Sequence, residues 1–273
     1  MSARYMPQAG SAPRLESCSI AESVSAPTLL EGEESGLQGG TYYRVVGQGP
    51  TVLLAHGLGH DLTLWDRVAA SLAPRFRVVR FDLLGHGRSA KPPGPYTLDS
   101  FLRQFDLLDR QVDLRSAHLV GHAAGALLCL RRGLIHQHSV SSALLLHPFA
   151  RPPLDEGATG MPELPCVVRA MRRRCDSVIL QCSTTIFQVF WQDLSKNVMK
   201  PAFPVEVING ASDPQSQAYE GPMGQDLVRM LEGANARTLT RMGTLSPLTA
   251  AEEIVGRVFA LMEQLGSRSI EEA

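Results

Sequence analysis

Short runs of apolar residues alternate with longer amphipathic segments along most of this chain. Most runs have the length and composition typical of strands that are buried on both faces of a parallel sheet. They predict strands at residues 41–46, 51–55, 77–81, 117–120, 142–146, 205–208 and 237–240. Apolar positions with helical spacing predict helices at residues 64–72, 97–112, 124–135 and 250–265. This alternation predicts an α/β fold with a doubly wound, mostly parallel sheet.

Two segments depart from the alternation. Residues 1–38 are rich in Ser, Ala, Pro, Gly and Glu and have little periodic apolar content, so we expect a disordered N-terminal extension. Residues 152–200 show helical patterns at 167–174 and 185–191 where another strand would be due, so we expect an inserted helical unit. The α/β core would then consist of residues 39–151 and 201–273.

Composition excludes several classes of function. The formal net charge of −1 gives no reason to expect a nucleic-acid partner. No apolar stretch approaches the roughly 20 residues that cross a bilayer, so we expect no membrane partner. The five cysteines show no C-x-x-C spacing, which argues against a disulfide framework and a zinc site. We therefore expect reduced thiols, a cytoplasmic protein, no metal and no cofactor.

Four motifs follow the predicted strands in order. They are H-G-L-G at residues 56–59, D-L-L-G-H-G-R-S at 82–89, G-H-A-A-G at 121–125 and G-A-S-D-P at 210–214. In this order they resemble the oxyanion loop, the D-x-x-G-x-G-x-S turn, the nucleophile elbow and the acid-bearing segment of the α/β-hydrolase superfamily, in its branch of small esterases and ring-cleavage hydrolases. The resemblance covers residues 40–265. It implies the α/β-hydrolase fold, with residues 152–200 as a lid over the substrate pocket.

The resemblance also implies which backbone groups would face a ligand. The N–H groups of Leu58 and Ala124 would form the oxyanion hole, with His56 and Gly57 in the same loop. Because these donors belong to the backbone, they do not depend on the side chain at the elbow. The implied partner is a small apolar or carbonyl-containing molecule in a lidded pocket; a protein partner is the alternative.

The side chains that hydrolysis requires are replaced. Ala123 stands where the elbow carries its nucleophile, and a methyl group has no lone pair with which to attack a carbonyl. Thr244 stands at the position of the catalytic histidine, and threonine is no base near neutral pH. Asp213 remains at the acid position, but the last histidine of the chain is His147. We therefore do not expect ordinary Ser-His-Asp hydrolysis.

Three other histidines are candidates for the pocket. His60 follows the oxyanion loop, His122 lies inside the elbow, and His147 ends a predicted strand at the carboxyl edge of the sheet. For His122 and His147 we favour a structural role, in packing or in a backbone hydrogen bond, over contact with a ligand. A basic run at Arg169, Arg172, Arg173 and Arg174 is expected to be a solvated helix face.

Three functions remain open from the sequence. The first is a pseudoenzyme that binds a ligand or a protein partner. The second is a non-hydrolytic enzyme, such as an isomerase, cyclase or lyase, that uses the oxyanion donors without covalent catalysis. The third is an ester or C–C bond hydrolase in an inactive form.

Overall fold

The fold is built on one twisted sheet. A computed structural model describes residues 29–148, 166–179, 199–210, 223–239, 242–243 and 245–271. In these residues eight strands form a sheet in the order β1-β2-β4-β3-β5-β6-β7-β8, antiparallel at β1 and β2 and parallel from β4 to β8. The strands are β1 (Glu34–Gln38), β2 (Thr41–Val46), β3 (Thr51–Ala55), β4 (Arg77–Phe81), β5 (Ala117–His122), β6 (Val140–Leu146), β7 (Val205–Gly210) and β8 (Asn235–Leu239).

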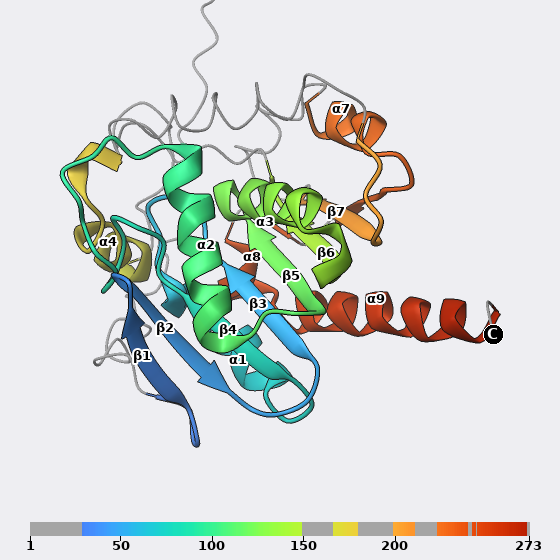
Figure 1. The fold of residues 1–273 in the computed structure, drawn as a ribbon, viewed down its shortest axis with the longest axis horizontal. Coiled ribbons are helices and arrows are strands. Elements are labelled where there is room, and N and C mark those ends of the chain that lie inside the picture. Colours follow the sequence, from blue (N-terminus) through green and yellow to red (C-terminus); the bar gives the residue numbers. More distant parts are fainter. Residues whose placement is uncertain are drawn as a thin grey trace, which may run out of the picture.

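Helices cover both faces of the sheet (Figure 1). α2 and α3 pack on one face, and α1 and α9 pack on the other. Alternate strand residues supply the two cores, since Leu53 belongs to the first and Leu54 to the second. The helices are η2 (Leu62–Trp65), α1 (Asp66–Leu72), α2 (Leu98–Val112), α3 (Ala124–Ile135), η3 (Gln137–Ser139), α4 (Cys166–Arg173), α7 (Met223–Met230), α8 (Ser246–Thr249) and α9 (Ala251–Glu271). The predicted doubly wound α/β architecture is confirmed.

Local sequence signals account for the start of α2. The hydroxyl of Thr97 accepts from the backbone N–H of Ser100, and the hydroxyl of Ser100 accepts from the N–H of Thr97. This reciprocal capping box satisfies two amides that the first helical turn would otherwise leave without partners. The helix that begins at this capping box, α2, then packs on one face of the sheet.

The predicted extent of the N-terminal extension needs correction. The disordered segment was expected to reach residue 38, but β1 begins at Glu34 and pairs with β2. Just before it, the side chain of Glu33 is buried and accepts from Arg44 and Arg80. Ion pairs with residues distant in sequence therefore anchor this stretch. The prediction of disorder relied on the low apolar content of the segment, which gives no information about such ion pairs.

Part of the insertion packs on the core. α4 agrees with the helix predicted at residues 167–174, whereas the helix predicted at 185–191 lies outside the described residues. After α4, the N–H of Asp176 donates to the carbonyl of Gly85 at 2.7 Å, and the hydroxyl of Tyr96 donates to Asp176 Oδ2 at 2.9 Å. Met171 and Ile179 are fully buried. This segment is therefore fixed to the loops at the carboxyl edge of the sheet.

Within the described ranges no helix combines the length and apolar character that a bilayer crossing requires.

Candidate active site

Ala123 occupies the sharp turn between β5 and α3. Its backbone has φ 51° and ψ −122°, a conformation that residues other than glycine rarely adopt. The N–H of Ala123 donates to the carbonyl of Leu146 at 2.9 Å, and its own carbonyl accepts from Ala126 at 3.0 Å. These bonds hold the turn between two parallel strands and the first turn of α3. The backbone therefore has the geometry of a nucleophile elbow, with a methyl group at its tip.

The two flanking glycines are required by close backbone contacts. A Cβ atom on Gly121 would lie 2.5 Å from the Cα atom of Ala126. A Cβ atom on Gly125 would lie 2.4 Å from the carbonyl oxygen of His56. Both positions therefore exclude a side chain, which explains the spacing of the G-H-A-A-G motif.

The oxyanion loop lies directly against the elbow. A Cβ atom on Gly57 would come within 2.9 Å of the Cβ atom of Ala123. No residue in the described part of the chain accepts a hydrogen bond from the N–H of Leu58 or Ala124. Ala124 is the first residue of α3, whose positive dipole end points toward the elbow. The predicted donors Leu58 and Ala124 thus lie next to Gly57 and Ala123, where the oxyanion loop and the elbow come close together.

Two buried histidines fix the loops behind these donors. His56 Nε2 accepts from the N–H of Leu83 at 3.0 Å while its Nδ1 lies 2.8 Å from the carbonyl of Gly57, a network that assigns the proton to Nδ1. His86 Nε2 accepts from the N–H of Gly59 at 3.0 Å. Burial lowers the pKa of His56 to about 4, so the ring is neutral and can accept. Both ring nitrogens of His56 are therefore engaged in holding the loop.

The other three predicted histidines form a row beside the elbow. The ring centroids of His60 and His122 are 5.5 Å apart, and those of His122 and His147 are 6.0 Å apart. The row continues to Ser246, whose Oγ lies 3.1 Å from His147 Nε2. His147 itself has a φ of 46° at the end of β6. The strand order β3-β5-β6 brings the row together.

His60 differs from its neighbours in hydrogen bonding. Its Nδ1 atom is buried and has no hydrogen-bond partner among the described residues. Burial lowers its pKa to about 4, with the positive charge of Arg172 acting in the same direction. A neutral, partly buried imidazole whose Nδ1 lacks a partner is a polar group that a ligand can satisfy.

Two of the predicted positions cannot be placed. Asp213 and Thr244 lie outside the described residues. Ser246, which the sequence analysis did not single out, lies two residues after Thr244 and is fully buried. Its only sequence signal is a Ser-Pro pair, which is common where a helix begins. In the residues that the structure covers, no group of three or more His, Cys, Asp or Glu side chains could hold a metal ion.

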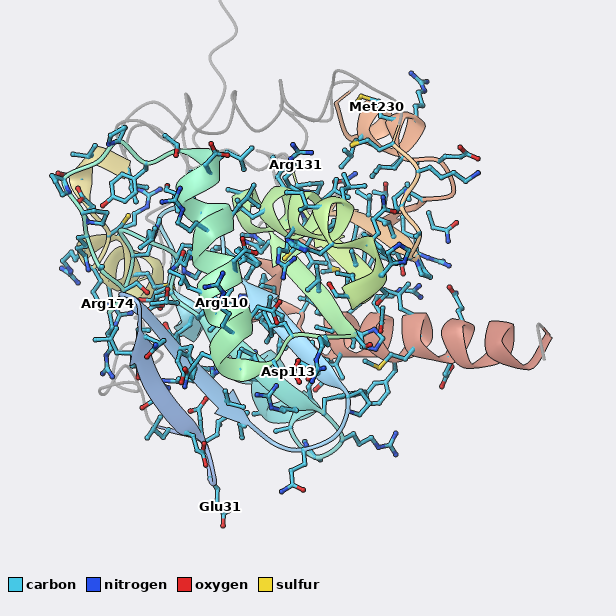
Figure 2. The ribbon with its side chains drawn as sticks, viewed as in Figure 1. Glu31, Arg110, Asp113, Arg131, Arg174 and Met230 are labelled. Atoms are coloured by element: carbon cyan, nitrogen blue, oxygen red, sulfur yellow. The ribbon has the colours of Figure 1, made fainter. Side chains whose placement is uncertain are left out.

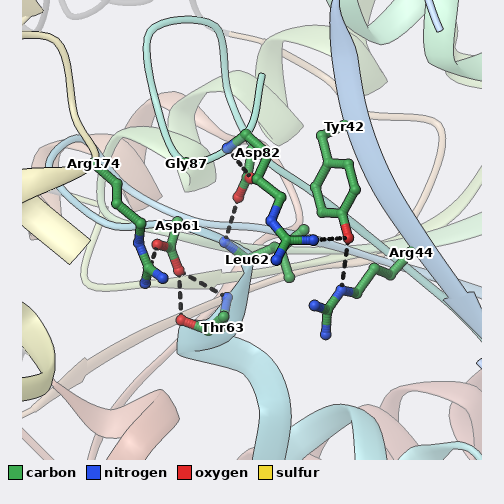
Figure 3. Close-up of a pocket in the computed structure, with 9 residues that line it drawn as sticks. Tyr42, Arg44, Asp61, Leu62, Thr63, Asp82, Gly87 and Arg174 are labelled. Carbon is green, nitrogen blue, oxygen red and sulfur yellow. Dashed lines mark hydrogen bonds and ion pairs between the residues drawn. The ribbon is translucent and has the colours of Figure 1, made fainter. Parts of the chain in front are cut away.

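A pocket is lined in part by Asp61, Leu62 and Thr63, which follow the oxyanion loop in sequence (Figure 3). Arg174 lies directly after α4 (Figure 2) and pairs with Asp61 at 2.5 Å in the pocket (Figure 3). Asp61 is buried, so the expectation that the basic run is only a solvated helix face is wrong for Arg174. Asp82 accepts from the N–H groups of Leu62 and Arg88 at 2.8 Å. Burial, together with the nearby charge of Asp61, raises the pKa of Asp82 to about 7.

Comparisons with known proteins agree with this geometry. Residues 50–164 match the family model described as alpha/beta hydrolase fold. An uncharacterized protein of Mycobacterium tuberculosis is 41% identical over 102 residues, which are 37% of this chain and 29% of that protein. A fluoroacetate dehalogenase from a Burkholderia species is 38% identical over 107 residues, 37% of this chain and 35% of that enzyme. A protein of Caulobacter segnis named as a carbamate hydrolase, RutD, is 35% identical over 103 residues, 37% of this chain and 39% of that protein.

These alignments cover less than half of the length of the curated relatives. Solved structures extend the likeness across the core. The enol-lactonase from Burkholderia xenovorans LB400 superposes with a TM-score of 0.65 at 21% identity, over 84% of this chain and 100% of that chain. The bromoperoxidase from Bacillus anthracis superposes with a TM-score of 0.69 at 17% identity, over 84% and 100%. At these identities the structures establish the fold.

Proposed function

We propose that this chain, which has the α/β-hydrolase fold, binds a small carbonyl-containing molecule at the elbow without forming an acyl-enzyme. The observation that carries the proposal is the methyl group of Ala123 in a turn that keeps the strained elbow backbone. A methyl group offers no lone pair, so the covalent step of ester hydrolysis has no acceptor atom at this position.

The backbone donors around Ala123 support a binding role. The N–H groups of Leu58 and Ala124 have no acceptor in the described part of the chain. A ligand carbonyl between them would receive two hydrogen bonds and the favourable end of the α3 dipole. The buried Nδ1 of His60 would supply a further polar contact. These groups recognise a polarised carbonyl oxygen, whether or not a reaction follows.

Binding of this kind fits two outcomes. A pseudoenzyme would release the ligand unchanged. An isomerase, cyclase or lyase would convert it by stabilising an enolate or a related oxyanion, since such reactions need positioned donors and no nucleophile on the enzyme. Thr244 at the histidine position of the sequence is compatible with both, because neither requires the triad base.

The named relatives favour a second candidate function. One is called a carbamate hydrolase and another a fluoroacetate dehalogenase. The second candidate is therefore a hydrolase of an ester, a carbamate or a C–C bond that is present here in an inactive form, with Ala123 as the inactivating difference. Both candidates expect an unreactive unaltered chain, so they differ in whether the Ala123→Ser, Thr244→His variant hydrolyses the molecule that the unaltered chain retains.

The first test uses activated esters and a fluorophosphonate probe. We expect no burst, no turnover with short nitrophenyl esters, and no covalent label on the purified chain. The double variant Ala123→Ser with Thr244→His should recover measurable esterase activity, whereas Ala123→Ser alone should recover far less, because triad members act as a unit. Turnover or labelling of the unaltered chain would contradict the proposal.

The second test identifies the ligand. Small molecules retained by the purified chain are released by denaturation and measured by mass spectrometry, and each is then incubated with fresh protein. A retained carbonyl compound that remains unchanged supports the pseudoenzyme, and its conversion supports a non-hydrolytic enzyme. A folded double variant without esterase activity, together with no retained molecule, would contradict ligand binding and favour a protein partner.

A further inference from the structure

The pocket drawn in Figure 3 lies outside the elbow and is not used by the proposed function. It is a shallow pocket that opens to solvent, and the roughly 220 Å³ of empty space within it includes part of that solvent. Three arginines line it from three separate elements: Arg44 from β2, Arg88 from the turn after β4, and Arg174 from the end of α4. We propose that this pocket binds the carboxylate group of a small anionic molecule.

Two of the guanidinium groups meet at one hydroxyl group. Arg88 donates to the hydroxyl oxygen of Tyr42 at 2.9 Å, and Arg44 donates to the same oxygen at 3.3 Å. Their guanidinium carbons lie 5.0 Å and 6.0 Å from the centre of the Tyr42 ring. The two positive charges around this neutral oxygen repel each other. An anion bound between them would attract both guanidinium groups, and these attractions would outweigh the repulsion.

The protein supplies little negative charge to this pair. The negative charge that is present lies beside Arg44: Glu33 is 3.4 Å away and shares its carboxylate with Arg80, and the carboxylate of Asp66 also interacts with Arg44. Arg88 has no carboxylate within ion-pair distance among the residues that the structure describes, and its only side-chain bond there is the one to Tyr42. Its remaining N–H groups are free to bind an anion.

Arg174 adds a donor from the opposite wall. One terminal nitrogen pairs with Asp61, while its Nε atom is buried without a hydrogen-bond partner in the described part of the chain. The two carboxylates in the lining are already engaged. Asp61 also accepts from Thr63, and each oxygen of Asp82 accepts one backbone N–H. The pocket therefore presents more unused donors than acceptors.

The geometry of the guanidinium donors and the small size of the pocket indicate the class of ligand. Guanidinium groups bind planar carboxylates through paired N–H groups, and Arg44 is almost fully buried, so its charge is poorly screened. The pocket is smaller than a typical site for a drug-sized molecule. A carboxylate group on a small molecule fits these limits better than a bulky phosphate ester.

Acetate is the probe for the test. Binding is measured on the full chain by NMR line broadening of ¹³C-acetate and by the shift of the unfolding temperature as acetate replaces chloride at constant ionic strength. We expect saturable binding that Arg88→Gln weakens at least about tenfold, the loss of one charged hydrogen bond. Arg115→Gln removes an arginine from an exposed pair with Asp113 and should leave acetate binding unchanged.

Several results would overturn the proposal. They are absence of saturable acetate binding, equal affinity of Arg88→Gln and the unaltered chain, or inorganic phosphate binding more tightly than acetate. If circular dichroism shows that Arg88→Gln does not fold, Arg174→Gln carries the same expectation; the Arg174 side chain is 37% exposed, and the amide of glutamine can still donate to Asp61. Failure here leaves the elbow proposal intact, because esterase recovery by the Ala123→Ser, Thr244→His variant does not involve this pocket.

Discussion

The Nε2 atom of His147 lies 3.1 Å from the Oγ atom of Ser246, across 99 residues of sequence. The bond joins the end of β6 to the start of α8, next to the strand that carries the elbow. Gly210 makes room for it, since a Cβ atom there would lie 2.7 Å from His147 Cε1. Ser246 is fully buried, so the pair links two segments of the candidate site and presents no exposed nucleophile.

Ser246→Ala should destabilise the fold by about 1–3 kcal/mol, because His147 would lose a partner in a buried environment. The free energy of unfolding is measured by urea denaturation. Ser141→Ala is the matched control, since Ser141 donates to the carbonyl of Ser116 in an exposed position. The control should change stability by less than about 0.5 kcal/mol. Equal effects of the two substitutions would show that the buried bond contributes nothing.

A second prediction concerns the contact between the elbow and the oxyanion loop. Gly125→Ala would press a methyl group against the carbonyl oxygens of His56 and Ala55, at 2.4 Å and 2.5 Å. Backbone atoms cannot move aside cheaply, so we expect a loss of about 1–3 kcal/mol in urea denaturation. This loss should outweigh the gain of up to about 1 kcal/mol that alanine brings to a helix.

Gly256→Ala serves as its control. Gly256 also lies in a helix, α9, but nothing is within 4 Å of a Cβ atom placed there. This substitution should stabilise the chain by up to about 1 kcal/mol. If Gly125→Ala stabilised the chain as well, the close approach of the loop to the elbow would be refuted.

The sequence predicts the framework of the elbow well. The strand Arg77–Phe81 and the helix Ala124–Ile135 have the predicted bounds, because each is a local pattern with clear ends. The glycines of the elbow motif could be identified because tight turns demand them at fixed spacing. Local sequence patterns and steric requirements therefore predict the part of the site that is formed by one continuous segment of the chain.

Contacts between distant segments were not predictable in the same way. His60, His122 and His147 become neighbours only through the strand order β3-β5-β6, which a single sequence does not specify. The pairing of Arg174 with Asp61 was missed because a run of arginines usually faces solvent. In both cases the information lies in the tertiary arrangement and has no local signal.

The attachment of the segment after α4 gives a third prediction. Burial and the nearby Asp176 carboxylate raise the pKa of Tyr96 above its usual range, so its hydroxyl stays protonated and donates to Asp176. Tyr96→Phe should speed hydrogen exchange of residues 166–179 about fivefold, the equivalent of about 1 kcal/mol. Tyr43→Phe is the control, because the Tyr43 hydroxyl has no hydrogen bond among the described residues. Unchanged exchange in Tyr96→Phe would show that this bond does not hold the segment.

The last prediction follows from the partly buried imidazole of His60, whose pKa is about 4 in the folded chain and about 6.5 when unfolded. Between these values the unfolded chain binds the extra proton, so His60 makes stability rise with pH from about 4 to 6.5. Asp82 acts in the opposite direction, because its pKa of about 7 lets the folded chain hold a proton that the unfolded chain has lost.

His60→Leu removes the first contribution and leaves the second. The slope of unfolding free energy against pH should fall by up to about 1.4 kcal/mol per pH unit between pH 5 and 6.5, measured by urea denaturation at half-unit steps. At pH 7 and above the variant should be as stable as the unaltered chain or more so, because a buried nitrogen without a partner is removed. His138→Leu, at an exposed position, should keep the original slope. An unaltered slope in His60→Leu would mean that this imidazole is hydrated in the folded chain, and its proposed contact with a ligand carbonyl would lose its basis.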